Sequence, residues 1–246
     1  MKSKYLCILI LFIGITLPMS AQSSEQFWID FNPSLERSRT FKYYGDLGYR
    51  TKVGNEKFNK IVARSGAEKS FKHFYLTGGL GNFVTWKNEE QDQTDVTVYE
   101  LRPYQGIGTN WPNTQYIKVN HYVRFEERMT WNITTADFDF SFRARYKFTF
   151  SYAYRTWLEN HHNWWKIYLS FELFGASSQS ENSIDEQTRL GIGVERSFSR
   201  NQKVRLETIW QKQASIFSSN VAGNAFYLRL RYYPNLNKRA LKAKNK

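Results

Sequence analysis

Cysteine and proline are scarce in this chain. One of its 246 residues is cysteine and five are proline. The cysteine, Cys7, lies in an apolar segment near the N-terminus, so disulfide bonds cannot stabilise the rest of an exported chain. No linker of low complexity divides the sequence, and no break in composition marks a boundary. We therefore expect one domain, at residues 22–236.

Long apolar runs are also missing. The run LCILILFIGITLPM at residues 6–19 is shorter than the roughly 18 residues that a transmembrane helix needs. Lys2 and Lys4 precede it, and the small residues of SAQ follow it, which is the layout of a secretory signal peptide. We predict a signal peptide at residues 1–21, cleaved after Ala21, and hence export by the Sec route.

Acidic residues are outnumbered. The chain has 35 Lys and Arg against 22 Asp and Glu, a formal net charge of +13. In a cytosolic protein this excess, with aromatic residues interleaved, would indicate nucleic-acid binding. Export argues against that partner, and we expect no nucleic acid. The segment KRALKAKNK at the end of the chain predicts a solvated basic tail at residues 237–246.

Aromatic residues are abundant and follow a period of two. There are 19 Phe, 16 Tyr and 8 Trp. In DFDFSFRARYKFTFSYAY, residues 137–154, an aromatic side chain occupies nearly every second position, with Asp, Ser, Arg and Lys between. A helix would scatter these aromatics around its circumference, whereas a strand collects them on one face. Similar segments, each with an apolar and a charged face, occur at 116–128, 165–174, 188–198, 203–210 and 226–233.

The N-terminal half alternates less regularly. Four segments there also read as strands, at residues 27–35, 41–51, 74–86 and 96–106. Residues 54–72 place Phe58, Ile61 and Val62 at helical spacing, and either a short helix or a further strand fits. The sequence predicts an all-β fold, an antiparallel barrel of about ten strands, with twelve as the alternative.

The long strands with bulky aromatic faces favour a transmembrane barrel. A strand that crosses a membrane needs about 9–11 residues, whereas strands of soluble proteins usually have about 5–6. A core filled by six such aromatic faces would be very crowded, but lipid accepts bulky side chains. Most tryptophans, among them Trp28, Trp86 and Trp131, lie at the ends of predicted strands, as in the aromatic girdles of membrane barrels. We therefore expect aromatic side chains outside and charged side chains inside.

Several short motifs, in this order, resemble a known family. They are YELRPYQ at 99–105, HYVRFEER at 121–128, FRARY at 142–146, FELF at 171–174 and RLGIGVE at 189–195. The chain resembles the family known as domain of unknown function 2490 (DUF2490), uncharacterised proteins typical of the Bacteroidetes and regarded as outer-membrane barrels. The resemblance implies the fold and the location and leaves the chemistry open. One feature departs from outer-membrane barrels in general, since they commonly end on an aromatic residue, whereas a basic extension follows Tyr233 here.

With this polarity, the inner face carries a cluster of arginines and glutamates. We expect pairs between neighbouring strands, such as Arg124 or Arg128 with Glu100 or Glu172, because a single buried charge costs several kcal/mol or so. Two interpretations stay open: a ladder that plugs a structural barrel, and an anion-favouring constriction. The predicted cluster consists of Glu100, Arg102, Arg124, Glu126, Arg128, Arg143, Arg145, Glu172, Arg189, Arg205, Glu207 and Arg229, joined by Lys147, Glu195 and Arg231.

Histidine is too sparse to indicate an enzyme. The four histidines are His73, His121, His161 and His162, and none stands two residues from a serine, the pairing that an outer-membrane hydrolase would need. His121 falls on the apolar face, and the last two lie in a predicted turn without the spacing of metal ligands. We expect no catalytic residue, no metal and no cofactor.

The sequence as a whole predicts a non-enzymatic outer-membrane barrel of a bacterium, porin-like, as a structural barrel or a narrow channel. Its expected partners are outer-membrane lipid, the barrel-assembly machinery during insertion, and small solutes. Two alternatives remain open. One is a lipid-modifying enzyme, a hydrolase or acyltransferase, and the other is a soluble periplasmic barrel that binds an apolar ligand.

Overall fold

The structure is a computed structural model that describes residues 23–52, 58–88, 95–154, 165–178, 184–199, 201–215 and 224–236. The predicted signal peptide and the predicted basic tail lie outside these residues, and so do His161 and His162. The described residues contain no helix that is both long and apolar enough to cross a membrane.

Strands make up almost all of the described chain. They are β1 (Ser23–Phe31), β2 (Ser34–Glu36), β3 (Phe41–Lys52), β4 (Phe58–Ser70), β5 (Tyr75–Asn88), β6 (Asp95–Asn113), β7 (Ile117–Asn132), β8 (Asp137–Tyr154), β9 (Trp165–Ser178), β10 (Ile184–Ser199), β11 (Gln202–Ser215) and β12 (Asn224–Pro234).

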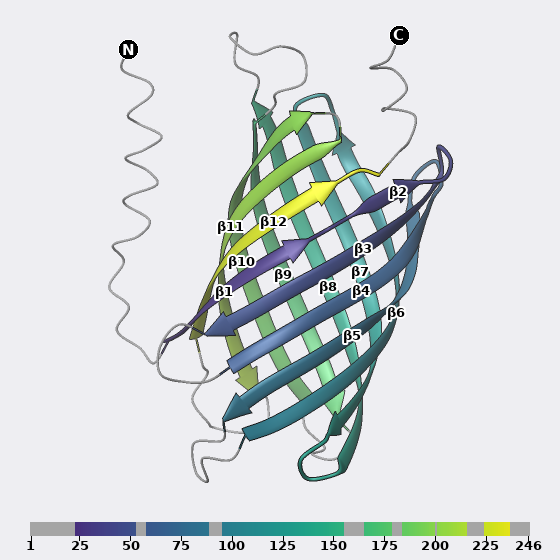
Figure 1. Cartoon of the computed structure of the whole chain (residues 1–246). Coiled ribbons are helices and arrows are strands. Elements are labelled where there is room, and N and C mark those ends of the chain that lie inside the picture. Colours follow the sequence, from purple (N-terminus) through teal and green to yellow (C-terminus); the bar gives the residue numbers. More distant parts are fainter. Residues whose placement is uncertain are drawn as a thin grey trace, which may run out of the picture.

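These strands close into a single barrel (Figure 1). From β3 to β12 each strand pairs with the next in antiparallel order, and β1 pairs with β3 on one side and with β12 on the other. The β1 and β2 segments keep one register on β3, and Pro33, which has no N–H group to donate, lies between them. They therefore act as one interrupted strand, and the barrel has eleven strands within the described residues.

The closing pair is parallel, with Trp28 opposite Arg229. In a chain that reverses direction at every hairpin, an odd number of strands leaves the first and the last pointing the same way. The predicted antiparallel barrel is therefore confirmed for every seam except this one, where β1 meets β12.

The eleventh strand comes from the segment that the sequence left undecided. We predicted ten strands, and β4 adds one. Its inward positions carry Lys60, Val62 and Arg64 at a period of two, but its outward positions include Ala63, Ser65 and Ala67, which are small. Because small outward side chains blur the contrast between the faces, the alternation is hidden there.

The polarity of the long strand β8 is as predicted. Phe138 and Phe142 are each 56% exposed on the outer face, whereas Ser141 between them is 5% exposed. The same holds where Leu228, 45% exposed, precedes Arg229, 8% exposed. The apolar rows therefore cover the outside of the barrel, and charged rows fill its inside.

Trp28 corrects the prediction of an outer girdle. It points into the barrel at 3% exposure and stacks on Tyr227 with ring centroids 4.4 Å apart, in a small apolar cluster with Ile209 and Ala225. Trp28 is two residues from Asp30 on β1, so both side chains point inward. The alternation of the strand therefore sets the direction of Trp28, and its nearness to the strand end does not. Trp86, 39% exposed, does lie outward near the end of β5.

Candidate functional site

The strand pleat brings the predicted charges together inside the barrel. Each lies in the inward phase of its strand and is buried or half-buried, and most pair with charges on neighbouring strands. This holds for Glu100, Arg102, Arg124, Glu126, Arg128, Arg143, Arg145, Lys147, Glu172, Arg189, Glu195, Arg205, Glu207, Arg229 and Arg231. Whether their role is structural or ion-selective stays a prediction.

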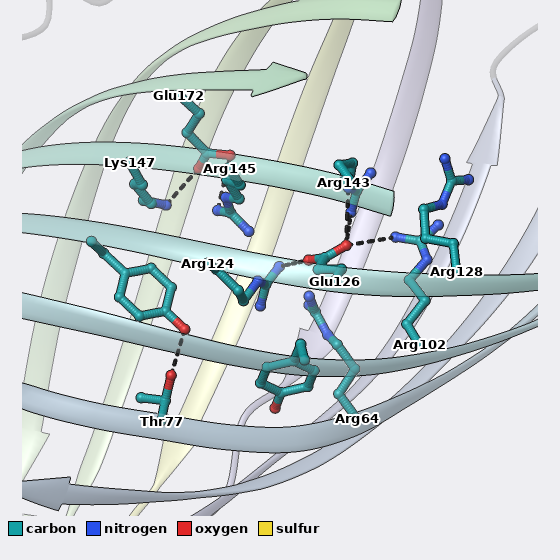
Figure 2. Close-up of polar contacts among 12 residues, drawn as sticks. Arg64, Thr77, Arg102, Arg124, Glu126, Arg128, Arg143, Arg145, Lys147 and Glu172 are labelled. Carbon is teal, nitrogen blue, oxygen red and sulfur yellow. Dashed lines mark hydrogen bonds and ion pairs between the residues drawn. The ribbon is translucent and has the colours of Figure 1, made fainter. Parts of the chain in front are cut away.

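Glu126 on β7 is the centre of one cluster (Figure 2). It is 3% exposed and contacts three arginines. Arg143 on β8 donates from Nε to its Oε2 atom at 2.9 Å, and Arg124 places Nη2 2.5 Å from Oε1. Arg102 on β6 lies 3.7 Å from Oε2. The three guanidinium groups thus share one carboxylate, and the cluster carries a net positive charge.

Glu100 on β6 holds a second cluster. Arg102 donates two hydrogen bonds to it, at 2.6 and 2.5 Å, which is the bidentate fork that favours arginine over lysine. Arg128 on β7 adds a bond of 2.6 Å, and Lys60 on β4 lies 3.9 Å away. The predicted pairing of Arg128 with Glu100 is confirmed, whereas Arg124 pairs with Glu126 on its own strand.

Glu172 on β9 is shared in the same way. Lys147 and Arg145 on β8 approach it at 2.6 and 2.9 Å, and Arg189 on β10 lies 3.9 Å away. Arg189 also donates from Nε to Gln211 at 2.7 Å. Here too the cations outnumber the carboxylate that they share.

A fourth group joins β9 to β12. Arg205 on β11 donates to Glu195 at 2.7 Å and to Glu207 at 3.3 Å, and Tyr168 donates to Glu195 at 3.0 Å. Arg231 on β12 reaches Glu207 at 3.1 Å. This network continues to the parallel seam through Asp30 of β1, a residue that was not predicted.

Sequence reasoning missed several charged residues of the interior on β1, β3 and β4. Asp30 pairs with Arg229 across the seam and is 1% exposed, and Asp46 pairs with Arg64 between β3 and β4. Arg50 and Lys60 lie on the same two strands, where Lys42 also pairs with Glu68. The signal was available on β3, where every second residue from Lys42 to Lys52 faces inward, but Gly48 interrupts that row.

A cavity of about 250 Å³ lies among these charges. Phe83 and Phe174 form two of its walls, and cations lie over their rings: Arg102 at 4.0 Å from the centroid of Phe83, and Arg189 at 4.6 Å from that of Phe174. No carboxylate is found among the described residues that line it. The lining residues are Arg50, Lys60, Arg64, Phe83, Arg102, Arg124, Arg128, Arg143, Arg145, Phe174, Ala176, Gln187 and Arg189.

A layer of tyrosines packs against glycines elsewhere in the interior. Tyr104 on β6 reaches across β5 and β4 to donate a hydrogen bond to Tyr44 on β3 at 3.1 Å. Its ring passes so close to Gly79 that a Cβ atom there would lie 2.6 Å from the Cζ atom of Tyr104. Tyr122 shares a hydrogen bond of 2.7 Å with Thr77 (Figure 2). Glycine is therefore required at such positions because any side chain would displace a hydrogen-bonded ring.

The two histidines within the described chain do not join the interior. His121 lies on the outer face, as predicted, where its Nδ1 atom is 2.9 Å from the Tyr146 hydroxyl and its ring meets Phe148 edge-on. His73 lies in the turn after β4, and its carbonyl accepts a hydrogen bond from Thr109. Among the described residues, no group of three His, Cys, Asp or Glu side chains is arranged to hold a metal ion.

Comparison with known proteins adds one match. A family model described as "Protein of unknown function (DUF2490)" matches residues 25–221, a range that begins in β1 and extends past the end of β11 at Ser215. Among the curated proteins, none matches the chain.

Proposed function

The chain belongs to the DUF2490 family, and from this premise and its charged barrel we propose that it is a bacterial outer-membrane protein that passes small anions. In this proposal the barrel spans the lipid, and its interior acts as a narrow anion-favouring channel without enzymatic activity. The bacterium would be of the Bacteroidetes, as the family resemblance implies.

The outer surface supports the location in lipid. Large apolar side chains such as Leu47, Phe125 and Ile192 are each more than half exposed, and they recur around the barrel. Soluble monomers rarely expose contiguous apolar patches of more than a few hundred Å². Within the described residues, closure also gives each of the eleven strands a partner on both sides, as a hydrocarbon environment demands. An apolar exterior with charges inside is the polarity of a membrane barrel.

One observation carries the anion preference. The cavity in the middle of the barrel is lined by eight arginines and one lysine, and no described carboxylate lines it. Rings of arginine and lysine are the device by which pores favour anions. A lipocalin-like soluble barrel with an apolar ligand would need an apolar interior instead.

A group of lysines supports an anion path at one barrel end. Lys42, Lys118, Lys166 and Lys203 are each the second residue of an odd-numbered strand and face inward. Lys118 and Lys166 both interact electrostatically with Lys203, and Lys118 also with Lys42. Glu68 pairs with Lys42 at 2.9 Å and offsets part of this charge, but the lysines remain in excess. An excess of cations around an opening raises the local concentration of anions.

The location is tested by fractionation of cells that express the full chain. We expect the protein in the detergent-insoluble outer membrane, with a gel mobility that changes on heating as a closed barrel unfolds. Recovery of the chain as a freely soluble periplasmic protein would contradict the membrane assignment.

The channel is tested by conductance in planar lipid bilayers under a KCl gradient. We expect small single-channel steps and a reversal potential displaced toward that of chloride. Arg128→Gln should reduce this displacement, because it removes a cavity charge while Glu100 keeps the bidentate Arg102. Arg39→Gln, which removes the same charge from an exposed hairpin, is the matched control. A cation-selective pore would contradict the proposal.

A second candidate is a structural barrel with a closed interior. The tyrosine layer favours it, because Tyr44, Tyr104 and Tyr122 occupy interior space beside β3–β7. Inserted, heat-modifiable protein that gives no conductance would select this candidate. Altered acyl chains in the lipids of a deletion strain would contradict both candidates and favour a lipid-modifying enzyme.

A further inference from the structure

We propose that the cavity inside the barrel is a binding site for a multivalent phosphate compound, held by guanidinium groups from several strands. The inference deepens the proposed channel by naming the anion that its lumen takes. It rests on the charge balance, the donor geometry and the size of the cavity, and the membrane location does not enter.

The first step is the charge balance around the cavity. Nine cations line it. The carboxylates that pair with them among the described side chains are Asp46, Glu100, Glu126 and Glu172. The cations therefore exceed these carboxylates by five. In an enclosed space such an excess costs several kcal/mol per uncompensated ion, so an anion that carries several charges is favoured over chloride.

The second step is how fully the carboxylates are already used. Glu126 and Glu172 each have three cations within 4 Å, and Glu100 also has three. A carboxylate has about four lone-pair sites, and a guanidinium has five N–H donors. Three guanidiniums around Glu126, and two guanidiniums with a lysine around each of the other two carboxylates, therefore retain N–H donors beyond those that the carboxylates can accept.

Arg50 differs from its neighbours in its contacts. Its guanidinium lies over the Trp28 ring at 4.0 Å from the centroid. Asp30 and Asp46 interact with it electrostatically, but within the described chain no carboxylate forms a direct ion pair with it. Arg50 lies on β3, and strands β4, β5 and β6 separate β3 from β7, which carries Glu126. An anion in the cavity would thus meet a cation that no carboxylate of the described chain contacts directly.

The donors surround the cavity and are held in place. They come from β3, β4, β6, β7, β8 and β10, which encircle most of the barrel. Phe174 supports Arg143, Arg145 and Arg189 at 5.2, 5.3 and 4.6 Å from its centroid. Because a guanidinium fork matches the oxygens of a phosphate, such a preorganised set recognises phosphate better than a spherical halide.

The size of the cavity limits the ligand. Sites for drug-sized molecules occupy about 300–1,000 Å³, and this cavity is about 250 Å³. A diphosphate or a small phosphate ester has a suitable size. The phosphate could belong to a free solute or to the headgroup of a lipid that enters from a barrel end, and the experiment distinguishes the two.

The test is calorimetric titration of the full chain, refolded in detergent, with inorganic pyrophosphate in chloride buffer. We expect saturable binding of one ligand per chain. Arg50→Gln and Arg128→Gln should each weaken binding by about tenfold or more, the equivalent of one charge-assisted contact. Arg39→Gln, with the same loss of charge outside the barrel, should bind as the parent does, and heat-modifiable mobility checks that each variant folds.

A short-chain phosphatidic acid in a parallel titration separates the sources. Tighter binding of pyrophosphate assigns the site to free phosphate compounds, and tighter binding of the lipid assigns it to a headgroup. Absence of saturable binding for both ligands, or equal binding by the Arg50 and Arg39 variants, would overturn the site. Saturable binding without conductance would refute the channel and support the site. Conductance without saturable binding would support the channel and refute the site.

Discussion

Glu126→Gln removes the carboxylate on which three arginines converge, and the structure predicts a large loss of stability. The side chain is 3% exposed, with Arg143 bonded at 2.9 Å, Arg124 at 2.5 Å and Arg102 at 3.7 Å. The glutamine keeps the shape but not the charge, so three buried guanidiniums lose their shared counterion. Breaking a buried ion pair by removing one partner costs about 3–5 kcal/mol.

The neighbouring residue supplies a control of matched chemistry. Glu127 lies one residue further along β7 and points to the outer face, opposite Phe142. The same change there, Glu127→Gln, leaves the interior untouched, and we expect no loss of stability from it.

The assay is urea unfolding of the barrel refolded in lipid vesicles, followed by heat-modifiable mobility and by tryptophan fluorescence. If the slope is about 2 kcal/mol per M, the expected loss lowers the midpoint of Glu126→Gln by roughly 2 M. Adding Arg143→Gln should recover part of it, because the second change removes one uncompensated charge. Equal midpoints for the Glu126 and Glu127 variants would refute the view that the interior ion pairs hold the barrel together.

Three further predictions follow from the packing and the polarity of the barrel. Gly79→Ala should lower stability by about 1–3 kcal/mol, because its Cβ would meet the Tyr104 ring and the Ser65 carbonyl oxygen. Gly175→Ala, where nothing lies within 4 Å, should not, and equal unfolding midpoints would contradict this reasoning. Leu228→Arg on the outer face should cost about 2–4 kcal/mol in vesicles, whereas Leu35→Arg near the barrel end should cost about 0–1 kcal/mol; no difference between them would argue against a lipid-facing waist. Trp28→Ala should cost about 3–5 kcal/mol because it removes a buried ring stacked on Tyr227. Trp111→Ala, at a position 75% exposed, should have little effect on the same midpoint, and a similar loss at both would contradict the inward placement of Trp28.

The direction of each side chain in the regular strands could be predicted from the sequence. In 137–154 the predicted outer and inner rows agree with the structure, since Phe138 and Phe142 are exposed and Ser141 is buried. The reason is local, because the pleat alternates side chains whatever the neighbouring strand is. The same argument placed the arginines and glutamates of β6–β12 in the interior before their partners were known.

The local pattern was insufficient where an outer row is small or an inner row is broken. In β4 the outward Ala63 and Ala67 hid the alternation, and in β3 a glycine, Gly48, interrupted the row that contains Asp46 and Arg50. All three cations that β3 and β4 contribute to the cavity lining were therefore missed. On β3, the period of two by itself would have identified the inward residues, because all of them have even numbers.

The sequence alone determined that the chain is built of strands with one apolar and one charged face, because alternation is a property of each strand by itself. Only the tertiary structure decided the number of strands, the parallel seam of β1 and β12, and the partner of each charge. Arg124 and Arg128 show why: both were predicted to pair with Glu100 or Glu172, but only Arg128 reaches Glu100 on β6, and Arg124 pairs with Glu126 on its own strand. Which carboxylate lies within reach depends on the geometry inside the closed barrel. The cation-lined cavity is likewise a product of closure, since its residues come from strands that meet only when the barrel is complete.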